Sequence, residues 1–489
     1  MEKLKVKIGL EVHVQLTKLK TKLFCSCPSD YRGKPPNTHV CPVCLGLPGS
    51  LPKVNIKAIE YAIMVALALN CKINKRILFF RKHYFYPDMT KNFQITQYDR
   101  AGGAPIAVNG YLKLNINGRE KIVRIRRINI EEDPGKLVYP TGSIITSPYT
   151  LVDYNRAGIA LLEIVTEPDM ETPAEARLFL QKLRSILEHL GVCDCGLEGA
   201  IRTDANISIA GGGRVEIKNI GSVKDVEKAL AYEILRQKEA FLKGVSIRSE
   251  TRHWDDVRKV TVPLRVKEKE QDYRYFPEAD IPPIIITDDY IEKVAKCMPE
   301  LPDERIKRFQ KEYGLPQYDA SVLVSNKKLA DFFEEAVKLY GRSPKKVANV
   351  IINDFLRWLH EKNMGISDVK TKPRDIAELL KLVDKGIISI KIAKEILPEM
   401  IVTGKKPKEV VREKGLLRIS DEQVLKPIIL RVFSEHKKAV YDALKDKKAI
   451  NYLIGQVMKH TKGRADPVIT RNIIVQLLEK IRKGENIIS

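Results

Sequence analysis

Four cysteines near the N-terminus are the residues whose types and spacing indicate chemistry most clearly. Cys25 and Cys27 form a C-x-C pair, Cys41 and Cys44 form a C-x-x-C pair, and residues 28–40 separate the two pairs. Four thiolates in two close pairs are the ligand set of a tetrahedral structural Zn²⁺ site. Disulfides are the alternative, but tight cysteine pairs in a chain that we expect to be cytoplasmic favour a metal. The sequence therefore predicts a zinc loop over residues 25–44.

A strand with a polar face directly precedes this loop. Apolar and polar residues alternate over Val6–Gln15, and Glu11 and His13 lie two apart, so both side chains point to one face. A buried glutamate is costly unless it is paired or bound to a metal. Carboxylates with one imidazole suit Mg²⁺, and a surface lattice of ion pairs is the alternative. The acidic residues that could join the two are Glu131, Glu132, Asp133, Asp204 and Glu216.

Two other segments interleave basic and aromatic residues. They cover residues 81–98, which include Lys82, Tyr84 and Lys91, and residues 272–278. Such patterns suit stacking and phosphate contacts, although aromatic residues at this density also build cores. The sequence G-x-x-x-x-G-K-[ST] is absent, so any phosphoryl chemistry must use a metal and positioned cations. The pair Cys193 and Cys195 is ambiguous, since a single C-x-C is a weak metal or redox signal.

Length and charge limit the class of protein. The chain has 489 residues, which predicts several domains, and it has no apolar run long enough to span a membrane. It carries 85 Lys and Arg against 62 Asp and Glu, a formal charge of +23. Such an excess favours an anionic partner, most often nucleic acid, over the charge-rich surface of a heat-adapted protein. Residues 401–489 alone hold 20 basic and 10 acidic residues, a net +10.

The pattern of elements predicts an α+β fold with an N-terminal antiparallel-sheet domain followed by two all-α domains. Strands are expected at 6–15, 122–130 and 215–220, and helices at 56–69 and 174–190. No βαβ alternation is recognisable, which argues against a doubly wound sheet. Helices follow in succession after the Pro-rich stretch near residue 282. The predicted domains are 1–290, 291–402 and a basic tail, 408–489.

Several long segments together resemble one family. The chain is similar to the B subunit of the tRNA-dependent amidotransferase, in collinear order from about residue 7 to residue 480. The segments that carry the resemblance are Ile8–Gln15, Tyr84–Asp88, Glu131–Asp133, Leu151–Gly158, Leu162–Asp169, Asp204–Asn206, Asp272–Glu278, Gly455–Met458 and Thr461–Gly463. A paralogue specific for Glu-tRNA(Gln) carries a long insertion after the catalytic part, and this chain lacks such an insertion.

The resemblance implies a carbon–nitrogen ligase that takes its amide nitrogen from glutamine, with a cradle-like catalytic domain formed by the antiparallel sheet of residues 1–290. With ATP and Mg²⁺, such a protein phosphorylates the side-chain carboxylate of misacylated Glu-tRNA(Gln), Asp-tRNA(Asn) or both, and ammonia then displaces the phosphate. Glu11, His13 and Glu132 match the family's Mg²⁺ cluster, with Asp204 and Glu216 near it. Lys82, Tyr84 and Lys91 match the segment that lines the ammonia route. The four cysteines match zinc-bearing members, where the zinc is structural.

The resemblance also implies partners. An amidase A subunit would release ammonia from glutamine, a small C subunit would join the two large subunits, and the helical and tail domains would grip the tRNA. The competing interpretation is a non-enzymatic zinc-containing protein that binds tRNA or assists assembly. The sequence identifies neither the ATP-contacting residues nor the preferred amino acid.

Overall fold

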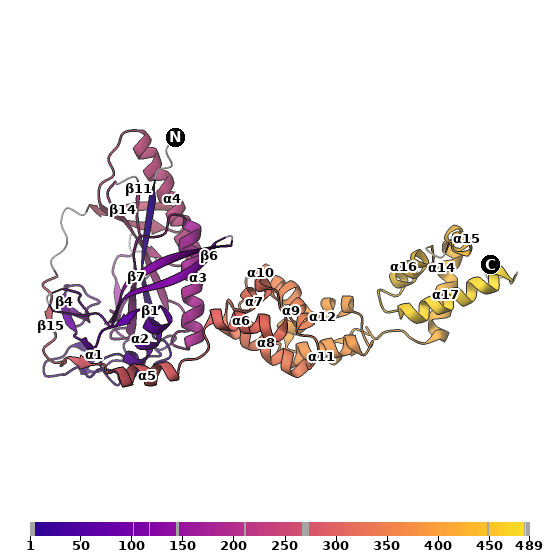
Figure 1. Cartoon of the computed structure of the whole chain (residues 1–489), viewed down its shortest axis with the longest axis horizontal. Coiled ribbons are helices and arrows are strands. Elements are labelled where there is room, and N and C mark those ends of the chain that lie inside the picture. Colours follow the sequence, from indigo (N-terminus) through magenta and orange to yellow (C-terminus); the bar gives the residue numbers. More distant parts are fainter. Residues whose placement is uncertain are drawn as a thin grey trace. The chain divides into compact units, whose positions relative to one another are not determined.

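The chain folds into two compact units, Met1–Glu304 and Arg305–Ser489. The computed structural model describes residues 5–100, 102–116, 118–142, 146–209, 212–266, 273–446, 449–483 and 485. Sheet elements occupy the first unit and helices the second, as Figure 1 shows by colour along the chain. The predicted α+β class, with a sheet domain followed by helical segments, is therefore confirmed.

A nine-stranded sheet organises the first unit. The strand order is β14-β13-β12-β11-β1-β10-β7-β6-β2, so the N-terminal strand β1 lies in the middle. Strand β1 pairs antiparallel with β10 and β11. The strands are β1 (Val6–Gln15), β2 (Lys72–Ile73), β6 (Ala107–Ile116), β7 (Arg119–Glu132), β10 (Ala160–Thr166), β11 (Ile201–Ile209), β12 (Val215–Ile220), β13 (Glu250–Asp255) and β14 (Val260–Val266).

Helices cover one face of this sheet and leave the other face polar. Alternating strand residues such as Leu10, Val12 and Val14 are fully buried in one hydrophobic core with helices α2 (Ile56–Ala68), α3 (Pro173–Leu190) and α4 (Val223–Leu242). Because side chains alternate along a strand, their neighbours in sequence point to the opposite face. The buried apolar face thus fixes which residues form the polar face.

One part of the topology differs from the prediction. Strands β12 and β13 pair in parallel, and α4 connects them, so the sheet contains one βαβ unit. All other ladders of the sheet are antiparallel. The segment Glu250–Asp255 contains only one strongly apolar residue, Trp254, which explains why a period-two pattern did not mark it as a strand.

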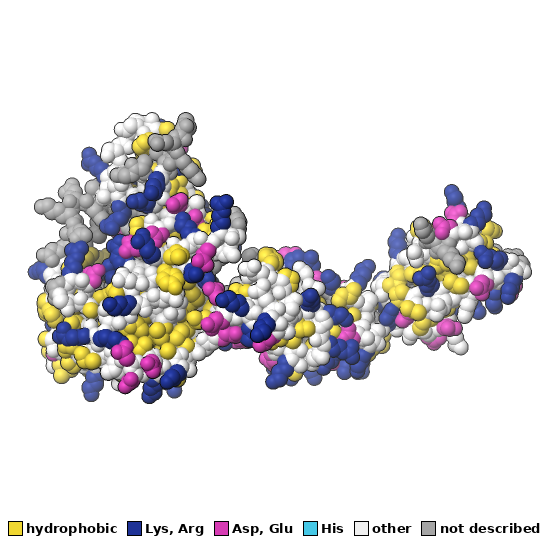
Figure 2. Space-filling model, in the orientation of Figure 1, with side chains coloured by type: hydrophobic (Ala, Val, Ile, Leu, Met, Phe, Trp, Pro, Cys, Tyr) yellow, Lys and Arg dark blue, Asp and Glu magenta, His cyan; other side chains and the backbone are white. Residues whose placement is uncertain are grey.

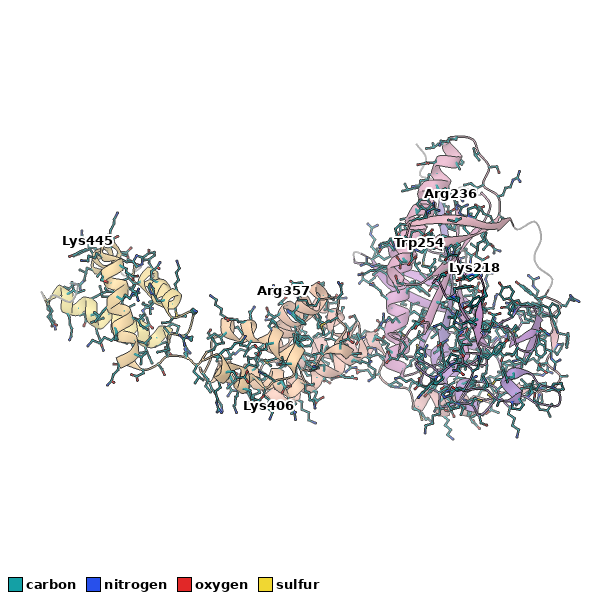
Figure 3. All side chains as sticks on the ribbon, turned by 180° about the vertical axis from the view of Figure 1, so that it is seen from behind. Lys218, Arg236, Trp254, Arg357, Lys406 and Lys445 are labelled. Atoms are coloured by element: carbon teal, nitrogen blue, oxygen red, sulfur yellow. The ribbon has the colours of Figure 1, made fainter. Side chains whose placement is uncertain are left out.

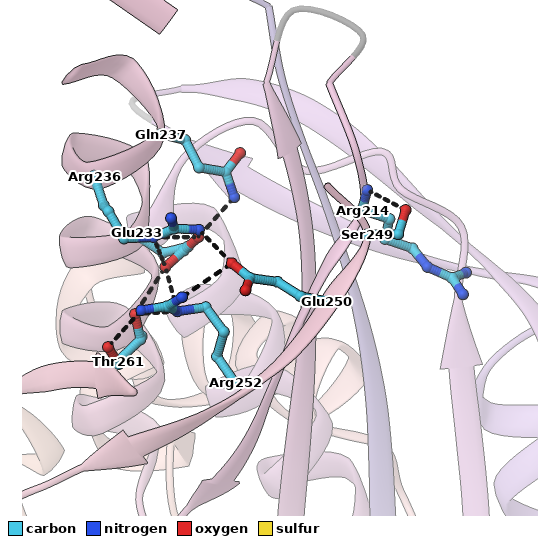
Figure 4. Close-up of polar contacts among 8 residues, drawn as sticks. All are labelled: Arg214, Glu233, Arg236, Gln237, Ser249, Glu250, Arg252 and Thr261. Carbon is cyan, nitrogen blue, oxygen red and sulfur yellow. Dashed lines mark hydrogen bonds and ion pairs between the residues drawn. The ribbon is translucent and has the colours of Figure 1, made fainter. Parts of the chain in front are cut away.

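A buried polar network fastens α4 to β13 and β14 (Figure 4). The fully buried Glu233 accepts hydrogen bonds from Arg236, Gln237 and Thr261 at 2.6, 2.8 and 2.8 Å. Arg252 of β13 donates to Thr261 at 2.9 Å and to Glu250 at 2.9 Å. The βαβ unit is therefore held by charge-assisted hydrogen bonds as well as by apolar packing.

Besides the large sheet, the described residues form three smaller sheets. Strands β4 (Phe80–His83) and β5 (Phe93–Thr96) form a hairpin, and β15 (Phe276–Pro277) pairs with β4. Strands β8 (Lys136–Val138) and β9 (Leu151–Asp153) form another hairpin. Strands β3 (Arg76–Ile77) and β16 (Ile284–Ile285) also pair. These sheets bring residues 76–98 and 273–285 together, although Asp272 of the second basic–aromatic segment lies outside the described residues.

The boundary between the units lies later than residue 290. Helix α5 (Asp288–Lys296) packs on the first unit, with Val294 buried in its core, and the units divide at Glu304. The second unit has two separate hydrophobic cores. One extends from Phe309 to Val411 and the other from Leu425 to Leu478.

The second unit is helical throughout its regular elements. The first core is built by α6 (Pro302–Tyr313), α7 (Gln317–Val324), α8 (Lys327–Tyr340), α9 (Pro344–Val350), η1 (Ile351–Leu356), α10 (Arg357–Glu361), α11 (Pro373–Asp384), α12 (Ile390–Thr403) and α13 (Pro407–Glu413). The second core is built by α14 (Glu422–Glu435), α15 (Lys437–Lys445), α16 (Ala449–His460) and α17 (Pro467–Arg482). Between α9 and α10 lies the π-helical segment η1, whose buried Asp354 pairs with Lys394 of α12 at 3.2 Å.

The surface of the C-terminal helices is basic. Figure 2 shows more Lys and Arg than Asp and Glu side chains on the visible face of this part. Within the described residues, no helix is both long enough and apolar enough to cross a membrane.

The network around Glu233 yields a stability prediction. We expect Glu233→Ala to lower the free energy of unfolding of the first unit by about 3 kcal/mol, because the buried Gln237, Arg252 and Thr261 would lose the carboxylate that they share, although Arg252 keeps Glu250. Glu227→Ala on the same helix is the control, since its exposed pair with Arg177 should contribute at most about 1 kcal/mol. Denaturant unfolding of the full-length chain measures both, and equal effects of the two substitutions would contradict the prediction.

Candidate functional site

A cleft of about 440 Å³ lies over the polar face of the large sheet. Five neighbouring strands contribute charged side chains to it: β1, β7, β10, β11 and β12. The residues are Glu11, His13, Glu131, Glu163, Arg202, Asp204 and Lys218. Their alignment follows from the register, since His13 lies opposite Glu163 on one side and Arg202 on the other.

Glu11, His13 and Glu163 form the centre of this cleft. One ligand atom of each lies within 4.8 Å of those of the other two. One carboxylate oxygen of Glu163 accepts a hydrogen bond from Asn129 at 2.6 Å, which orients the side chain. Two carboxylates and one imidazole at this separation could hold a divalent cation with only a small adjustment.

Glu131 is the fourth member of the cluster and bonds to the imidazole. The His13 Nε2 atom lies 3.4 Å from Glu131 Oε1 and 3.8 Å from Glu11 Oε1. Burial disfavours the imidazolium, but the hydrogen bond with Glu131 and the charges of Glu163 and Glu11 raise the pKa of His13 to about 9. Burial and the neighbouring Glu163 raise the pKa of Glu11 above its ordinary value. The imidazolium is thus the counter-cation of this acidic group, and a metal bound to the imidazole would displace its proton.

Glu132 does not lie with Glu11 and His13. Successive residues of a strand point to opposite faces, so Glu131 enters the cleft whereas Glu132 turns away from it. Glu132 is buried and forms an ion pair with Lys91 at 2.7 Å, and it accepts a hydrogen bond from the Ile95 amide at 2.9 Å. These residues line a second cavity of about 320 Å³, together with Cys25, Cys44, Arg81, Glu278 and Asp280.

The β4–β5 hairpin separates the two cavities. Lys82 of β4 and its partner Gln94 of β5 line the cleft. Their neighbours Arg81, Phe93 and Ile95 line the second cavity instead. The Gln94 side chain also donates to the backbone oxygen of Glu132 at 2.7 Å, which ties the hairpin to the end of β7.

Two of the predicted residues, Lys82 and Tyr84, lie on the cleft side of this hairpin. The Lys82 ammonium lies 4.9 Å from the centre of the Tyr273 ring, as in a cation–π contact. Burial disfavours its charge, but the nearby Tyr275 and the carboxylates of Glu131 and Glu163 hold the pKa of Lys82 above its ordinary value. Tyr84 lies near Asp88, with 3.4 Å between the hydroxyl and the carboxylate. Lys91, the third residue matched to the ammonia route, faces the second cavity.

Asp204 and Lys218 line the other end of the cleft, and Lys218 joins Asp204 to the buried Glu216. The Lys218 ammonium lies 2.9 Å from Asp204 and 3.1 Å from Glu216. Asp204 is the register partner of Glu11, and Thr251 of β13 donates to Glu216 at 3.2 Å. These residues therefore continue the charged row that starts at Glu131.

The four predicted zinc ligands lie together. The Sγ atoms of the four residues all lie within 4.8 Å of one another: Cys25, Cys27, Cys41 and Cys44. A tetrahedral Zn²⁺ with four thiolates requires sulfur–sulfur separations of about 3.8 Å, so the donor set and its spacing fit this metal. The hydrogen bond from Cys25, together with the Lys22 ammonium, lowers the pKa of Cys44 to about 4, which favours the thiolate that a metal needs.

The cysteine loop forms part of the wall of the second cavity, which Cys25, Cys44 and Gly46 line together with Lys91. The fully buried Lys22 donates to Cys44 Sγ at 3.6 Å and to the His39 oxygen at 2.8 Å. The Thr90 hydroxyl donates to the Cys44 oxygen at 2.8 Å. Gly46 has φ +67°, and a Cβ atom there would meet the Lys91 side chain at 2.5 Å. The loop thus packs closely against Lys91.

Sequence reasoning missed Glu163, Lys22 and the role of Glu131 beside His13. Glu163 stands in the apolar run Ala160–Thr166, where one acidic residue in an otherwise apolar strand is the signal that could have found it. Lys22 precedes the cysteines with no distinguishing pattern. Cys193 is buried and Cys195 partly buried, and the two form no metal cluster with other described residues.

Comparisons with known proteins relate most of the chain to the same family. Residues 6–292 match the family model described as the GatB/GatE catalytic domain, and residues 331–478 match that of the GatB domain. A protein of Saccharolobus solfataricus is 60% identical over 97% of this chain and 99% of its own length. A protein of Thermotoga maritima is 51% identical over 96% of this chain and 98% of its own length. Both carry the name of the B subunit of aspartyl/glutamyl-tRNA(Asn/Gln) amidotransferase.

The central cluster predicts divalent cation binding that depends on Glu163. We expect Glu163→Gln to weaken Mn²⁺ binding at least about tenfold, because a ligand carboxylate is lost. Titration followed by electron paramagnetic resonance on the full-length chain measures this. Glu167→Gln is the control, since Glu167 pairs with Arg126 outside the cleft. Unchanged Mn²⁺ affinity in Glu163→Gln would contradict the assignment.

The cysteine cluster predicts bound zinc. We expect the parent chain to carry about one equivalent of zinc and Cys41→Ser to lose most of it, since structural zinc sites use four protein ligands. Metal analysis of the purified proteins provides the measurement. Cys71→Ser is the control, because Cys71 lies apart from the cluster. Equal zinc content in Cys41→Ser and the parent would exclude the four-thiolate site.

Proposed function

The chain belongs to the GatB family, and on this premise we propose that it is the ATP-dependent component of a tRNA-dependent amidotransferase. Its substrate would be the side-chain carboxylate of misacylated Glu-tRNA(Gln), Asp-tRNA(Asn) or both. The observation that carries the proposal is the match of both units to one family, with a charged cleft at the centre of the matched catalytic domain. The chemistry of the cleft agrees with this activity.

The reaction that we propose has two steps. The carboxylate oxygen attacks the γ-phosphorus of ATP and ADP leaves, which gives an acyl phosphate. Ammonia then attacks the acyl carbon, the C–O bond breaks, inorganic phosphate leaves, and the nitrogen loses a proton to give the amide. Phosphorylation is needed because a carboxylate is a poor electrophile, and the anionic reactants must be brought together against their repulsion.

We propose that Glu11, His13 and Glu163 hold the Mg²⁺ that the first step requires, with Glu131 orienting His13. Bound Mg²⁺ would offset charge on the phosphates and on the substrate carboxylate. The acidic cluster supports this assignment, since carboxylates gathered around one imidazole attract cations. Asp204 and Glu216 extend the acidic row beyond Glu11, on strands β11 and β12.

Ammonia would enter from the second cavity. We propose that it passes Lys91 and Glu132, crosses the β4–β5 hairpin and reaches the acyl phosphate beside Lys82 and Tyr84. The two cavities on opposite sides of one hairpin support such a route. In this proposal Glu132 controls the passage through its ion pair with Lys91, and the family-derived role of Glu132 as a metal ligand is the alternative.

The partners follow from the activity. We propose that an amidase A subunit supplies the ammonia from glutamine and that a small C subunit completes the complex. Misacylated tRNA would contact the basic C-terminal helices, which fits the net +10 of residues 401–489. Structural zinc at the four cysteines would keep Lys91 in place.

A non-enzymatic tRNA-binding or assembly protein is the weaker alternative. Such a protein would need the basic helices and the zinc loop, but it would not need a row of buried and half-buried carboxylates around an imidazole. The relatives also carry a name that denotes part of an amidotransferase. The enzyme is therefore the function that the observations favour.

Glu132→Gln tests the proposal in the complex of this chain with its amidase partner. We expect glutamine-dependent amidation of misacylated tRNA to fall by about 10²-fold or more. Without the ion pair between Glu132 and Lys91, ammonia would no longer be directed to the acyl phosphate, and misplacing a reactant costs a factor of this size. Glutaminase activity and the ATP hydrolysis that depends on misacylated tRNA should persist. High external ammonium should restore part of the amidation if the residue serves the ammonia route.

Two other outcomes identify where the proposal fails. Loss of tRNA-dependent ATP hydrolysis in Glu132→Gln would contradict the role in ammonia delivery and favour Glu132 as a metal ligand. Absence of such ATP hydrolysis in the parent complex would favour the binding protein. Glu171→Gln serves as the control, because Glu171 contributes to neither cavity.

A further inference from the structure

Two exposed aromatic side chains beside the cleft have no role in the mechanism proposed so far. Phe85 and Tyr86 belong to the basic–aromatic segment 81–98 and lie in the connection between β4 and β5. They are 67% and 49% exposed. Single exposed apolar residues are common on protein surfaces, but two adjacent exposed rings next to a cleft favour a contact with a ligand.

The turn that carries these rings starts and ends at the cleft. Tyr84 on one side of it and Met89 on the other both line the cleft. Lys218 of β12, labelled in Figure 3, lies at one end of the cleft, and the β4–β5 hairpin with Lys82 lies at the other. Tyr86 therefore lies at the mouth of the cleft, at the end where we place the acyl phosphate.

The ring of Tyr86 keeps much of its face free. It lies beside Tyr84 with 6.4 Å between the ring centres and 22° between the ring planes. Tyr98 and Tyr275 show close stacking in the same domain, with 4.1 Å between the centres and 5° between the planes. At the larger separation the rings of Tyr84 and Tyr86 cover little of each other, so an aromatic face stays open to a planar ligand.

Hydrogen bonds hold the backbone of this turn in place. The Tyr154 hydroxyl donates to the Pro87 oxygen at 2.8 Å. The Gly135 amide donates to the Asp88 oxygen at 2.8 Å. The ring of Pro87 also fixes its own φ angle. The turn thus presents its aromatic side chains in a preorganised form, which lowers the entropic cost of binding a ligand.

The proposed substrate has a planar group at a matching distance. In misacylated tRNA the amino acid is esterified to the ribose of the terminal adenosine, and its side-chain carboxylate lies roughly 10 Å from the base along the covalent bonds. Tyr86 follows Lys82 by four residues, which span at most about 14 Å of chain. With the acyl phosphate beside Lys82 and Tyr84, the base would therefore reach Tyr86.

An exposed cation for the RNA backbone lies close to the turn. Lys136 follows Gly135, whose amide binds the turn, and the Lys136 side chain is 43% exposed. Its ion pair with Glu198 at 3.0 Å is a surface pair, since the Glu198 side chain is 82% exposed, and such a pair is weak enough to be exchanged for a phosphate contact. An aromatic face and a nearby cation are the two groups that proteins combine to bind single-stranded RNA.

We propose that Tyr86 stacks on the base of the 3′-terminal adenosine of misacylated tRNA, with Phe85 beside it and Lys136 near the adjoining phosphate. The proposal rests on the proposed function. It gives the tRNA end an approach over the β4–β5 turn, so that the aminoacyl group points past Tyr84 toward the acidic cluster. Tyr86 is then a binding residue for the tRNA, separate from the groups that contact the reacting atoms.

Amidation by the full-length chain in complex with its partner proteins tests this proposal. We expect Tyr86→Ala to raise the KM for misacylated tRNA by about 5- to 100-fold, because loss of base–aromatic stacking has effects of this size. The kcat and the KM for ATP should change far less. Tyr86→Trp should keep most of the affinity, because it keeps an aromatic face. Phe241→Ala is the control, since Phe241 is an exposed ring of the first unit that lines neither cavity.

Binding of uncharged tRNA with and without its terminal adenosine is the second measurement. We expect the parent complex to bind the intact tRNA more tightly, because the base that stacks on Tyr86 is present only there. The Tyr86→Ala complex should lose this preference, and the Phe241→Ala complex should keep it.

The outcomes separate the possible failures. An unchanged KM or a preserved preference for the terminal adenosine in Tyr86→Ala would overturn the proposal. An equal loss in Tyr86→Ala and Tyr86→Trp, with a lowered melting temperature, would also overturn it, because Tyr86 would then only stabilise the turn. Loss of the partner proteins from the Tyr86→Ala complex would assign the turn to a subunit interface instead. A parent complex that does not amidate misacylated tRNA would overturn the proposed function, whereas tRNA binding would still measure the preference for the adenosine.

Discussion

The concentration of negative charge on one face of the central sheet is the constraint on which the rest of this structure depends. Five carboxylates on neighbouring strands, Glu11, Glu131, Glu163, Asp204 and Glu216, would repel one another without cations between them. His13, Lys82 and Lys218 supply those cations. The opposite face of the same strands is buried under α2, α3 and α4 and stabilises the sheet through apolar packing. The charged site thus lies on one face of the sheet, while apolar packing on the opposite face stabilises that sheet.

Features of the site that depend on residues close together in the sequence could be predicted, whereas those that depend on the pairing of distant strands could not. The face shared by Glu11 and His13 follows from a spacing of two within one strand, and the boundaries of β1 and β12 were predicted from alternation alone. Glu131 and Glu132 show the limit, because both match the family segment but only the register of β7 against β10 decides which one faces His13. Glu163 was missed for the same reason, since its partner across the sheet lies about 150 residues away in the chain.

The fold shows the same division between local and long-range information. Helices α2 and α3 were predicted within a residue or two, since their apolar spacing and start signals are local. The βαβ unit was missed because β13 is mostly polar and gains its place through Arg252, Glu250 and the buried Glu233. Helix α5 belongs to the first unit because Val294 packs into the core of that unit. The composition of the sequence does not reveal this contact.

The central position of β1 has a consequence for how this protein is made. Residues 6–15 are synthesised long before their sheet partners, residues 160–166 and 201–209. Until residues 160–166 have been made, an alternating apolar strand that contains Glu11 and His13 has no native neighbour on either edge, and its second edge stays unpaired until residues 201–209 follow. Contacts of such sequence separation form slowly, and an unpaired apolar strand is prone to association with other chains. The strand at the centre of the sheet is therefore made well before either of the neighbours that complete its pairing.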